Sequence, residues 1–177
     1  DVISKNGSIL TNSSKNVISA ENIKLISEKG DIGSQTKNIQ TAIYNKGLLS
    51  GKGNNIYINY PYSDISNINI EAKDNAYLAT SGEKLGGLDS IVNIKANSLE
   101  LKAENGTIDL DATQNTNINI DVNKVKARAK DDISIINKGD LKISSITSEN
   151  QGTITLGSEI GSIVATDTET INPYHIN

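Results

Sequence analysis

Three carboxylates in the middle of the chain are the residues best placed for acid–base chemistry. Asp109 and Asp111 flank Leu110, and Asp121 follows Ile120, so all three fall on the polar side of an alternating pattern and point away from the core. Glycoside hydrolysis needs two carboxyl groups roughly 5 to 9.5 Å apart, and residues i and i+2 of a strand can meet that separation. A solvated strand also places acidic residues at these positions, and no aromatic platform for a sugar accompanies them. We therefore expect a solvated face and no catalytic residues.

Other familiar chemistries find little support in the sequence. The single histidine, His175, is the third residue from the end, a poor place to position an imidazole for nucleophilic catalysis. The pair Gly86-Gly87 is not repeated, unlike the tandem glycine-rich nonapeptides that bind calcium in β-rolls. The segment 51–53 (GKG) lacks the spacing and the Lys-Ser/Thr ending of a phosphate-binding loop. We expect no metal site and no cofactor.

A cluster of tyrosines is the surface feature most suited to binding. Tyr57, Tyr60 and Tyr62 lie in the segment 45–64, which also holds three glycines and Pro61, a residue that cannot donate to a strand ladder. We interpret 45–64 as a protruding loop or short hairpin. Tyrosines on such a loop offer amphipathic contact area for a host-cell surface protein or glycan. The alternative is that they only pack the loop onto the rest of the molecule.

The elements that must position these side chains are short strands. Apolar residues recur in a period-2 pattern, separated by Asn, Gly, Ser and Asp, and no stretch shows sustained helical spacing. The repeated units are Ile23-Lys-Leu25, Ile68-Asn-Ile70, Val92-Asn-Ile94, Leu99-Glu-Leu101, Ile108-Asp-Leu110, Ile118-Asn-Ile120 and Leu141-Lys-Ile143. Each unit is too short to be stable alone, which indicates stacked coils.

The spacing of these units predicts a parallel β-helix with three faces. From Val92 onward the units follow one another every seven to ten residues, so three of them make a coil of about 23 to 26 residues. A Gly-X-Ile/Leu marker recurs at a compatible period, beginning at Gly7, Gly30, Gly106, Gly139, Gly152 and Gly161. We expect Gly and Asn at corners that need positive φ, and asparagines that align between coils to form amide ladders.

Composition agrees with a narrow core and excludes several functional classes. Phe, Trp, Met and Cys are absent, so Ile, Leu, Val and Ala must fill the interior without disulfides. The net charge of −4 and the single arginine, Arg128, give no electrostatic footprint for nucleic acid. No run is long and apolar enough for a membrane span, and no signal peptide opens the chain.

Two related phrases connect the chain with a known family. Gly-Asp-Ile-Gly-Ser at 30–34 and Ser-Glu-Ile-Gly-Ser at 158–162, with the alternation of 98–103 and 104–112, resemble the haemagglutinin-type repeats of filamentous-haemagglutinin-like exoproteins. Gram-negative bacteria secrete these proteins by the two-partner (type Vb) route. The resemblance implies a right-handed parallel β-helix, export through an outer-membrane transporter partner, and work as an adhesin, cytolysin or contact-dependent toxin carrier.

These observations lead to one interpretation of the whole chain. We expect 1–177 to be a single all-β, right-handed parallel β-helix segment, with 167–177 as an irregular tail or the entry to a next coil. The family's Asn-Pro-Asn-type secretion signature has no counterpart here, so we expect an internal segment of a larger exoprotein, secreted or on the bacterial surface. The expected role is a noncatalytic shaft or binding segment of an adhesin or toxin. The alternative is a β-helical polysaccharide lyase or hydrolase.

Overall fold

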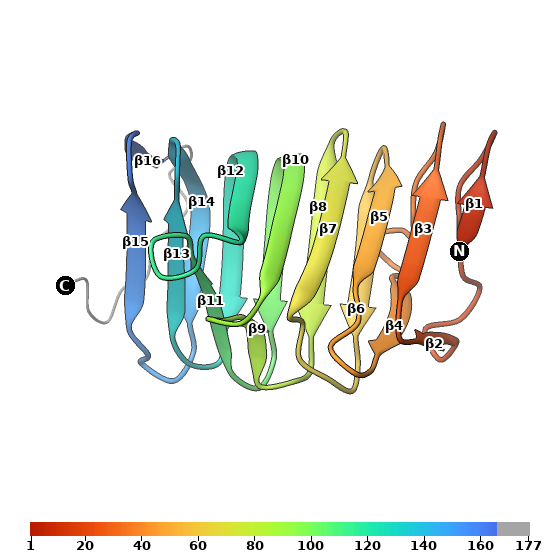
Figure 1. Ribbon diagram of the computed structural model, residues 1–177, viewed down its shortest axis with the longest axis horizontal. Coiled ribbons are helices and arrows are strands. Elements are labelled where there is room, and N and C mark those ends of the chain that lie inside the picture. The colour runs from red at the N-terminus through yellow and green to blue at the C-terminus, as the bar shows by residue number, and fades with distance from the viewer. Residues whose placement is uncertain (166–177) are drawn as a thin grey trace.

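The structure is a parallel β-helix, confirming the fold class expected from the sequence. The computed structural model describes residues 1–165, and within that range it holds sixteen strands and no helix, so none that could span a membrane. Successive coils of about 23 residues stack into about seven turns. The first and last strands, β1 (Val2–Ser4) and β16 (Ile163–Ala165), lie at opposite ends of the long axis (Figure 1).

Three faces run along the helix axis, and every strand pair between coils is parallel. The first face contains β1, β3 (Ile23–Ser27), β5 (Leu49–Gly53), β7 (Asn67–Ala72) and the first parts of β10 (Ile91–Ala103) and β12 (Ile118–Ala129). The second contains β2 (Val17–Ala20), β4 (Ile39–Ile43), β6 (Ile56–Tyr60), β8 (Asn75–Thr80) and the later parts of β10 and β12. It continues into β14 (Leu141–Ser148), which pairs with the later part of β12, and β16, which pairs with the start of β14. The third contains β9 (Lys84–Gly86), β11 (Thr107–Asp111), β13 (Ile133–Asn137) and β15 (Ile154–Ser158).

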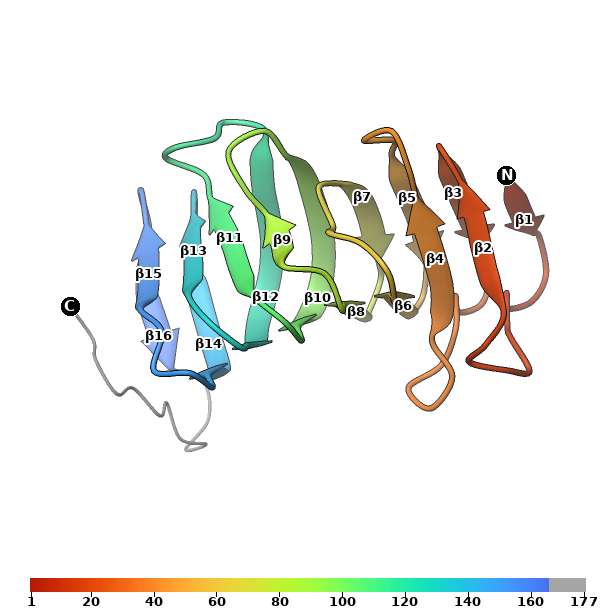
Figure 2. The ribbon, with the colours of Figure 1, turned by 90° about the horizontal axis from the view of Figure 1, so that it is seen from below.

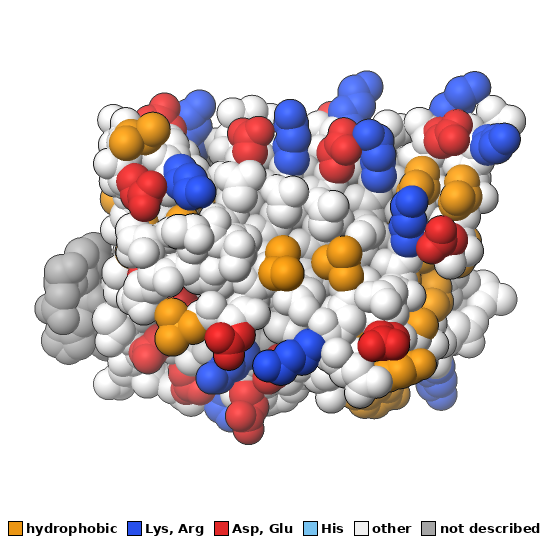
Figure 3. Space-filling view, in the orientation of Figure 1, with side chains coloured by type: hydrophobic (Ala, Val, Ile, Leu, Met, Phe, Trp, Pro, Cys, Tyr) orange, Lys and Arg blue, Asp and Glu red, His pale blue; other side chains and the backbone are white. Residues whose placement is uncertain are grey.

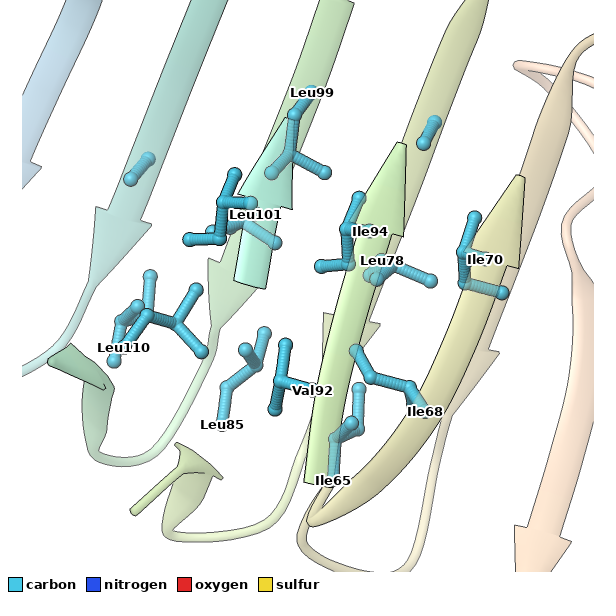
Figure 4. Packing of buried hydrophobic residues seen from close by; sticks show 14 of the residues in the cluster. Ile65, Ile68, Ile70, Leu78, Leu85, Val92, Ile94, Leu99, Leu101 and Leu110 are labelled. Atoms are coloured by element: carbon cyan, nitrogen blue, oxygen red, sulfur yellow. The ribbon is translucent and has the colours of Figure 1, made fainter. Parts of the chain in front are cut away.

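The core is a set of axial columns of aliphatic side chains. Ile70 pairs with Ile94 and Ile94 with Ile120, so residues of the same kind lie above one another in successive coils. A second column joins Leu78 and Leu101 on the second face. The labelled side chains point into the space between the faces (Figure 4). This packing explains why a chain without Phe, Trp or Met has a continuous core, since small branched side chains fill a narrow tube.

Four of the six marker glycines, Gly30, Gly106, Gly152 and Gly161, are required by close contact between coils rather than by positive φ, whereas Gly7 and Gly139 have room for a Cβ. Positive φ occurs at Gly33, Gly86 and Gly87, and none of the six marker glycines is among them. A Cβ on Gly30 would lie 2.7 Å from the carbonyl carbon of Gly7, and one on Gly152 would lie 2.5 Å from the corresponding atom of Asp131. The expectation of positive φ is therefore wrong for the marker glycines, whereas Asn45, at φ 56 in the turn before β5, meets it.

Buried or half-buried hydroxyls fix several of these corners. The Ser27 Oγ donates to the Gly7 carbonyl oxygen at 2.7 Å and accepts from the Gly30 amide at 3.1 Å, joining two coils. The same two bonds are made by Ser148 with Asp131 and Gly152, by Ser158 with Gly139 and Gly161, and by Thr80 with Ser63 and Gly82. The hydroxyl thus satisfies backbone groups that a tight corner leaves without strand partners.

The segment 45–64 is a regular coil, so the predicted protruding loop or hairpin is wrong. Its strands β5 and β6 pair in parallel with the coils on both sides. Pro61 directly follows β6, where its missing N–H removes no bond from the ladder. The glycines and the proline of this segment, which suggested a loop, are accommodated in the short corners of the coil and in β5. The predicted tail at 167–177 lies outside the described residues.

The segments that do project are 10–16 and 33–38. Ile32 pairs with Ile56 and Ile39 with Ile58, so in the second coil residues 33–38 occupy the place that Tyr57 alone takes in the third. The loop 10–16 lies in the equivalent place of the first coil, and both extend beyond the strand layers below β2 and β4 (Figure 2). The second face therefore carries these two projecting loops at one end, and Tyr57 is the outward residue of the next coil beside the 33–38 loop.

Candidate functional site

The three tyrosines predicted to bind together do not form one surface. Tyr57 lies on the outside of β6 and is half-buried, whereas Tyr60 is a core residue with only 2% of its surface exposed. Tyr62 follows the strand and is 77% exposed. The alternation Ile56, Ile58, Tyr60 inward places Tyr60 in the core, so the binding prediction is wrong for this residue.

The buried phenol of Tyr60 predicts a loss of stability in alkali. Burial raises its pKa far above the ordinary value of 10, and the hydrogen bond with Thr41 only partly opposes that effect. Above pH 10 the unfolded phenol ionises and the folded one does not, so unfolding becomes easier as pH rises. We expect up to about 1.4 kcal/mol of unfolding free energy to be lost per pH unit from this group.

Urea unfolding between about pH 8 and about pH 11 measures this effect. Tyr60→Phe should remove this part of the alkaline loss, and the exposed Tyr62→Phe should retain it. An unchanged pH dependence in Tyr60→Phe would contradict the prediction.

A small cleft on the second face places Tyr57 beside a tyrosine that the sequence interpretation missed. Tyr57 of β6 pairs in register with Tyr77 of β8, and both side chains line a cleft of about 290 Å³. Gln35 and Asn38 line it on the side of the 33–38 loop, and Glu100 of β10 lines it on the other. The tyrosines are 20 residues apart, one coil of this part of the chain and shorter than the 23 to 26 residues expected from the sequence, so the pairing was not indicated by the repeat.

The wall formed by the 33–38 loop is held by its own hydrogen bonds. Ser34 and Lys37 exchange two backbone bonds of 3.0 and 3.1 Å, and the Ser34 Oγ also accepts from the Lys37 amide. Gly33 at φ 73 begins the turn, and a Cβ there would lie 2.5 Å from the Tyr57 carbonyl oxygen. Only glycine fits here, because any Cβ would overlap the backbone of the strand below and φ is positive.

The candidate catalytic carboxylates have different environments, and one of them serves a turn. Asp111 is 4% exposed, and its Oδ1 accepts from the Thr113 amide at 2.8 Å, the Thr113 hydroxyl at 2.6 Å and the Gln114 amide at 3.2 Å. Burial acts to raise the pKa of Asp111, but these bonds outweigh it and hold the pKa below its usual value. The expectation that Asp111 faces solvent was wrong, because the turn after β11 folds over it. For Asp109, burial and then the charge of Asp111 raise the pKa.

Replacing Asp111 tests its structural role. Asp111→Ala should lower the free energy of unfolding by about 1 to 3 kcal/mol, since three donors of the turn lose their acceptor. The exposed Asp121→Ala should change it by less than about 0.5 kcal/mol. Thermal and urea unfolding of the two variants measure the difference, and equal stabilities would contradict this assignment.

Asp121 belongs to a ladder of alternating charge on another face. Lys52, Glu71, Lys95 and Asp121 occupy one register column, with Lys52 Nζ 2.9 Å from Glu71 Oε2 and Lys95 Nζ 3.8 Å from Asp121 Oδ2. Acidic and basic side chains alternate along this edge of the molecule (Figure 3). The same residues line a shallow groove of about 760 Å³ at the corner of the first and second faces. Asp121 lies on the first face, whereas Asp109 and Asp111 belong to β11 of the third, so the three carboxylates do not form one site.

Amide ladders confirm the hypothesis that asparagines align between coils. Asn119 donates to the Asn93 side-chain oxygen at 3.1 Å, and Asn93 donates to Asn69 at 3.2 Å. A second ladder runs from Asn75 through Asn55 to Asp31, with distances of 2.7 and 2.9 Å. These side chains bond along the axis and favour the in-register stacking of coils.

Comparisons with known proteins identify no relative. The chain matches no family model, and comparison with curated proteins and with solved structures found no significant similarity. Function must therefore be inferred from the fold, the side-chain contacts and the sequence resemblance.

Proposed function

We propose that this chain is a noncatalytic shaft and binding segment of a large secreted bacterial adhesin or toxin, mediating contact with host cells or other cells. The supporting observation is that outward side chains are bonded along the axis from coil to coil, as in the ladder Asn69–Asn93–Asn119 and the ion pairs Lys52–Glu71 and Lys95–Asp121, which share one register column. Each coil contacts its neighbours over its whole width, a construction suited to an extended rod.

The resemblance to haemagglutinin-type repeats supplies the biological setting of this proposal. In that setting the rod is exported with the rest of its parent protein through an outer-membrane transporter, which recognises a different part of that parent. The rod then holds binding surfaces away from the bacterium, and the partner is a protein or glycan of the contacted cell surface.

A polysaccharide lyase or hydrolase is the alternative, and Asp109 is the observation in its favour. A carboxyl group whose pKa is raised by burial is suited to donate a proton to a leaving group. Asp111, its nearest acidic neighbour along the strand, is however held by Thr113 and Gln114. The geometry therefore favours the shaft.

Two assays distinguish these functions. The chain is incubated with neutral and acidic polysaccharides, and new reducing ends and unsaturated products are measured. We expect none, and turnover that disappears in Asp109→Asn would overturn the proposal in favour of the enzyme. In parallel, beads coated with the folded chain are compared with beads carrying the heat-unfolded chain for attachment to cultured host cells. Attachment specific to the folded chain is the expected result.

A further inference from the structure

We propose that the cleft over Tyr57 and Tyr77 is a binding site for a neutral carbohydrate of one or two rings. The inference rests on the proposed adhesive function for its biological setting, while its physical basis lies in the cleft itself. It would make this segment a direct contributor to adhesion rather than only a spacer.

The floor of the cleft is a strip of two aromatic side chains. Tyr57 and Tyr77 are register neighbours on adjacent parallel strands, which are spaced about 4.8 Å apart, and both are half-buried on the outer side. The apolar C–H groups of a sugar ring pack on such a surface, and the phenol hydroxyls remain available for hydrogen bonds. Burial raises the pKa of both tyrosines, so both phenols are neutral donors at physiological pH.

The walls supply the polar groups that sugar hydroxyls require. Gln35 and Asn38 belong to the projecting turn at one end, whose backbone is fixed by the Ser34–Lys37 pairing. Ser98 and Glu100 of β10 line the opposite end. Amides, a hydroxyl and a carboxylate around an aromatic floor can donate to and accept from neighbouring hydroxyls of one ring. A volume of about 290 Å³ is at the lower end of the usual range for ligand pockets, and this limits the occupant to one or two rings.

The charges around the cleft favour a neutral sugar over an acidic one. Glu100 is the one charged side chain among the described residues that line it. The nearby cations have acidic partners: Lys126 Nζ lies 3.5 Å from Glu100, and Lys102 Nζ lies 2.7 Å from Glu104. A sialic or uronic acid would therefore place its negative carboxylate beside Glu100, and no residue lining the cleft carries a positive charge to bind it.

Saturation-transfer NMR and titration calorimetry with the whole chain test the proposal. The probes are lactose, N-acetyllactosamine, cellobiose and maltose, with 3′-sialyllactose as the acidic comparison. We expect at least one neutral disaccharide to bind with a dissociation constant of about 1 mM or below, and more tightly than the sialylated sugar. Tyr77→Leu, which removes the aromatic ring and keeps apolar bulk, should weaken binding at least about tenfold. Tyr62→Leu, outside the cleft, should leave it unchanged.

Circular dichroism of each variant separates loss of binding from loss of fold. The proposal is overturned if no neutral probe binds at about 10 mM, if a folded Tyr77→Leu binds as well as the parent, or if the acidic sugar binds more tightly. Attachment to cells without any sugar binding would leave the proposed function standing and reject this site, with a protein partner as the remaining explanation. Turnover of polysaccharide would instead reject the noncatalytic function itself.

Discussion

Gly106→Ala is expected to lower the free energy of unfolding by about 3 kcal/mol or more, since the added methyl group meets backbone that cannot yield without moving a whole coil. A Cβ at this position would overlap the carbonyl oxygen of Glu83 in the preceding coil. That carbonyl is itself bonded to the Thr107 amide at 2.9 Å, so relieving the overlap also disturbs the junction between the coils. Thermal and urea unfolding followed by far-UV circular dichroism measure the loss.

Gly139→Ala is the matched control, since Gly139 begins the same Gly-X-Ile/Leu marker as Gly106. No heavy atom lies within 4 Å of a Cβ placed on Gly139, and its φ is not positive. Alanine here should be neutral or stabilising by up to about 1 kcal/mol, because it restricts the unfolded chain. If both substitutions cost the same, contact between coils does not explain the marker glycines.

Leu101→Ala is expected to lower the free energy of unfolding by about 2 to 5 kcal/mol through loss of buried surface and creation of a cavity. Leu101 has no exposed surface and lies between Leu78 and Ala127 in its axial column. Each coil of a solenoid is stabilised by its two neighbours, so a cavity in the middle of the column weakens coils on both sides. A lower urea midpoint and a lower melting temperature are the expected observations.

Ile91→Ala provides the comparison within the same strand. Ile91 is the first residue of β10 and is 53% exposed, so its replacement should change stability by less than about 0.5 kcal/mol. Equal losses of unfolding free energy for Ile91→Ala and Leu101→Ala would contradict the placement of Leu101 in the core and of Ile91 at the surface.

Much of the fold could be predicted because alternation and spacing are local properties. The unit Ile68-Asn-Ile70 specifies which side chains face inward, and repetition of such units within one coil length specifies stacking. The asparagine ladders followed from the same reasoning and are present at Asn69, Asn93 and Asn119. The coil at 45–64 was missed because glycine and proline at short corners have the same composition as a projecting loop.

The candidate site was only partly predictable. Tyr57 was identified, but it was grouped with Tyr60 and Tyr62 by nearness in sequence, whereas its neighbour in the cleft is Tyr77. Asp111 was placed on a solvated face by alternation alone, and the turn that covers it depends on Thr113 and Gln114. In both cases the decisive contacts come from a different coil or from a turn outside the strand pattern.

Alternating polarity within a few residues is enough to predict the inward residues of most strands and their stacking in parallel coils. Which residues of successive coils become neighbours depends instead on contacts that exist only in the folded chain. Leu49 pairs with Ile68 and Val92 with Ile118, separations of 19 and 26 residues, so coil length varies with the loops and corners between strands. Hydrogen-bond register across coils sets the pairing of Tyr57 with Tyr77, and that register is a property of the stacked chain.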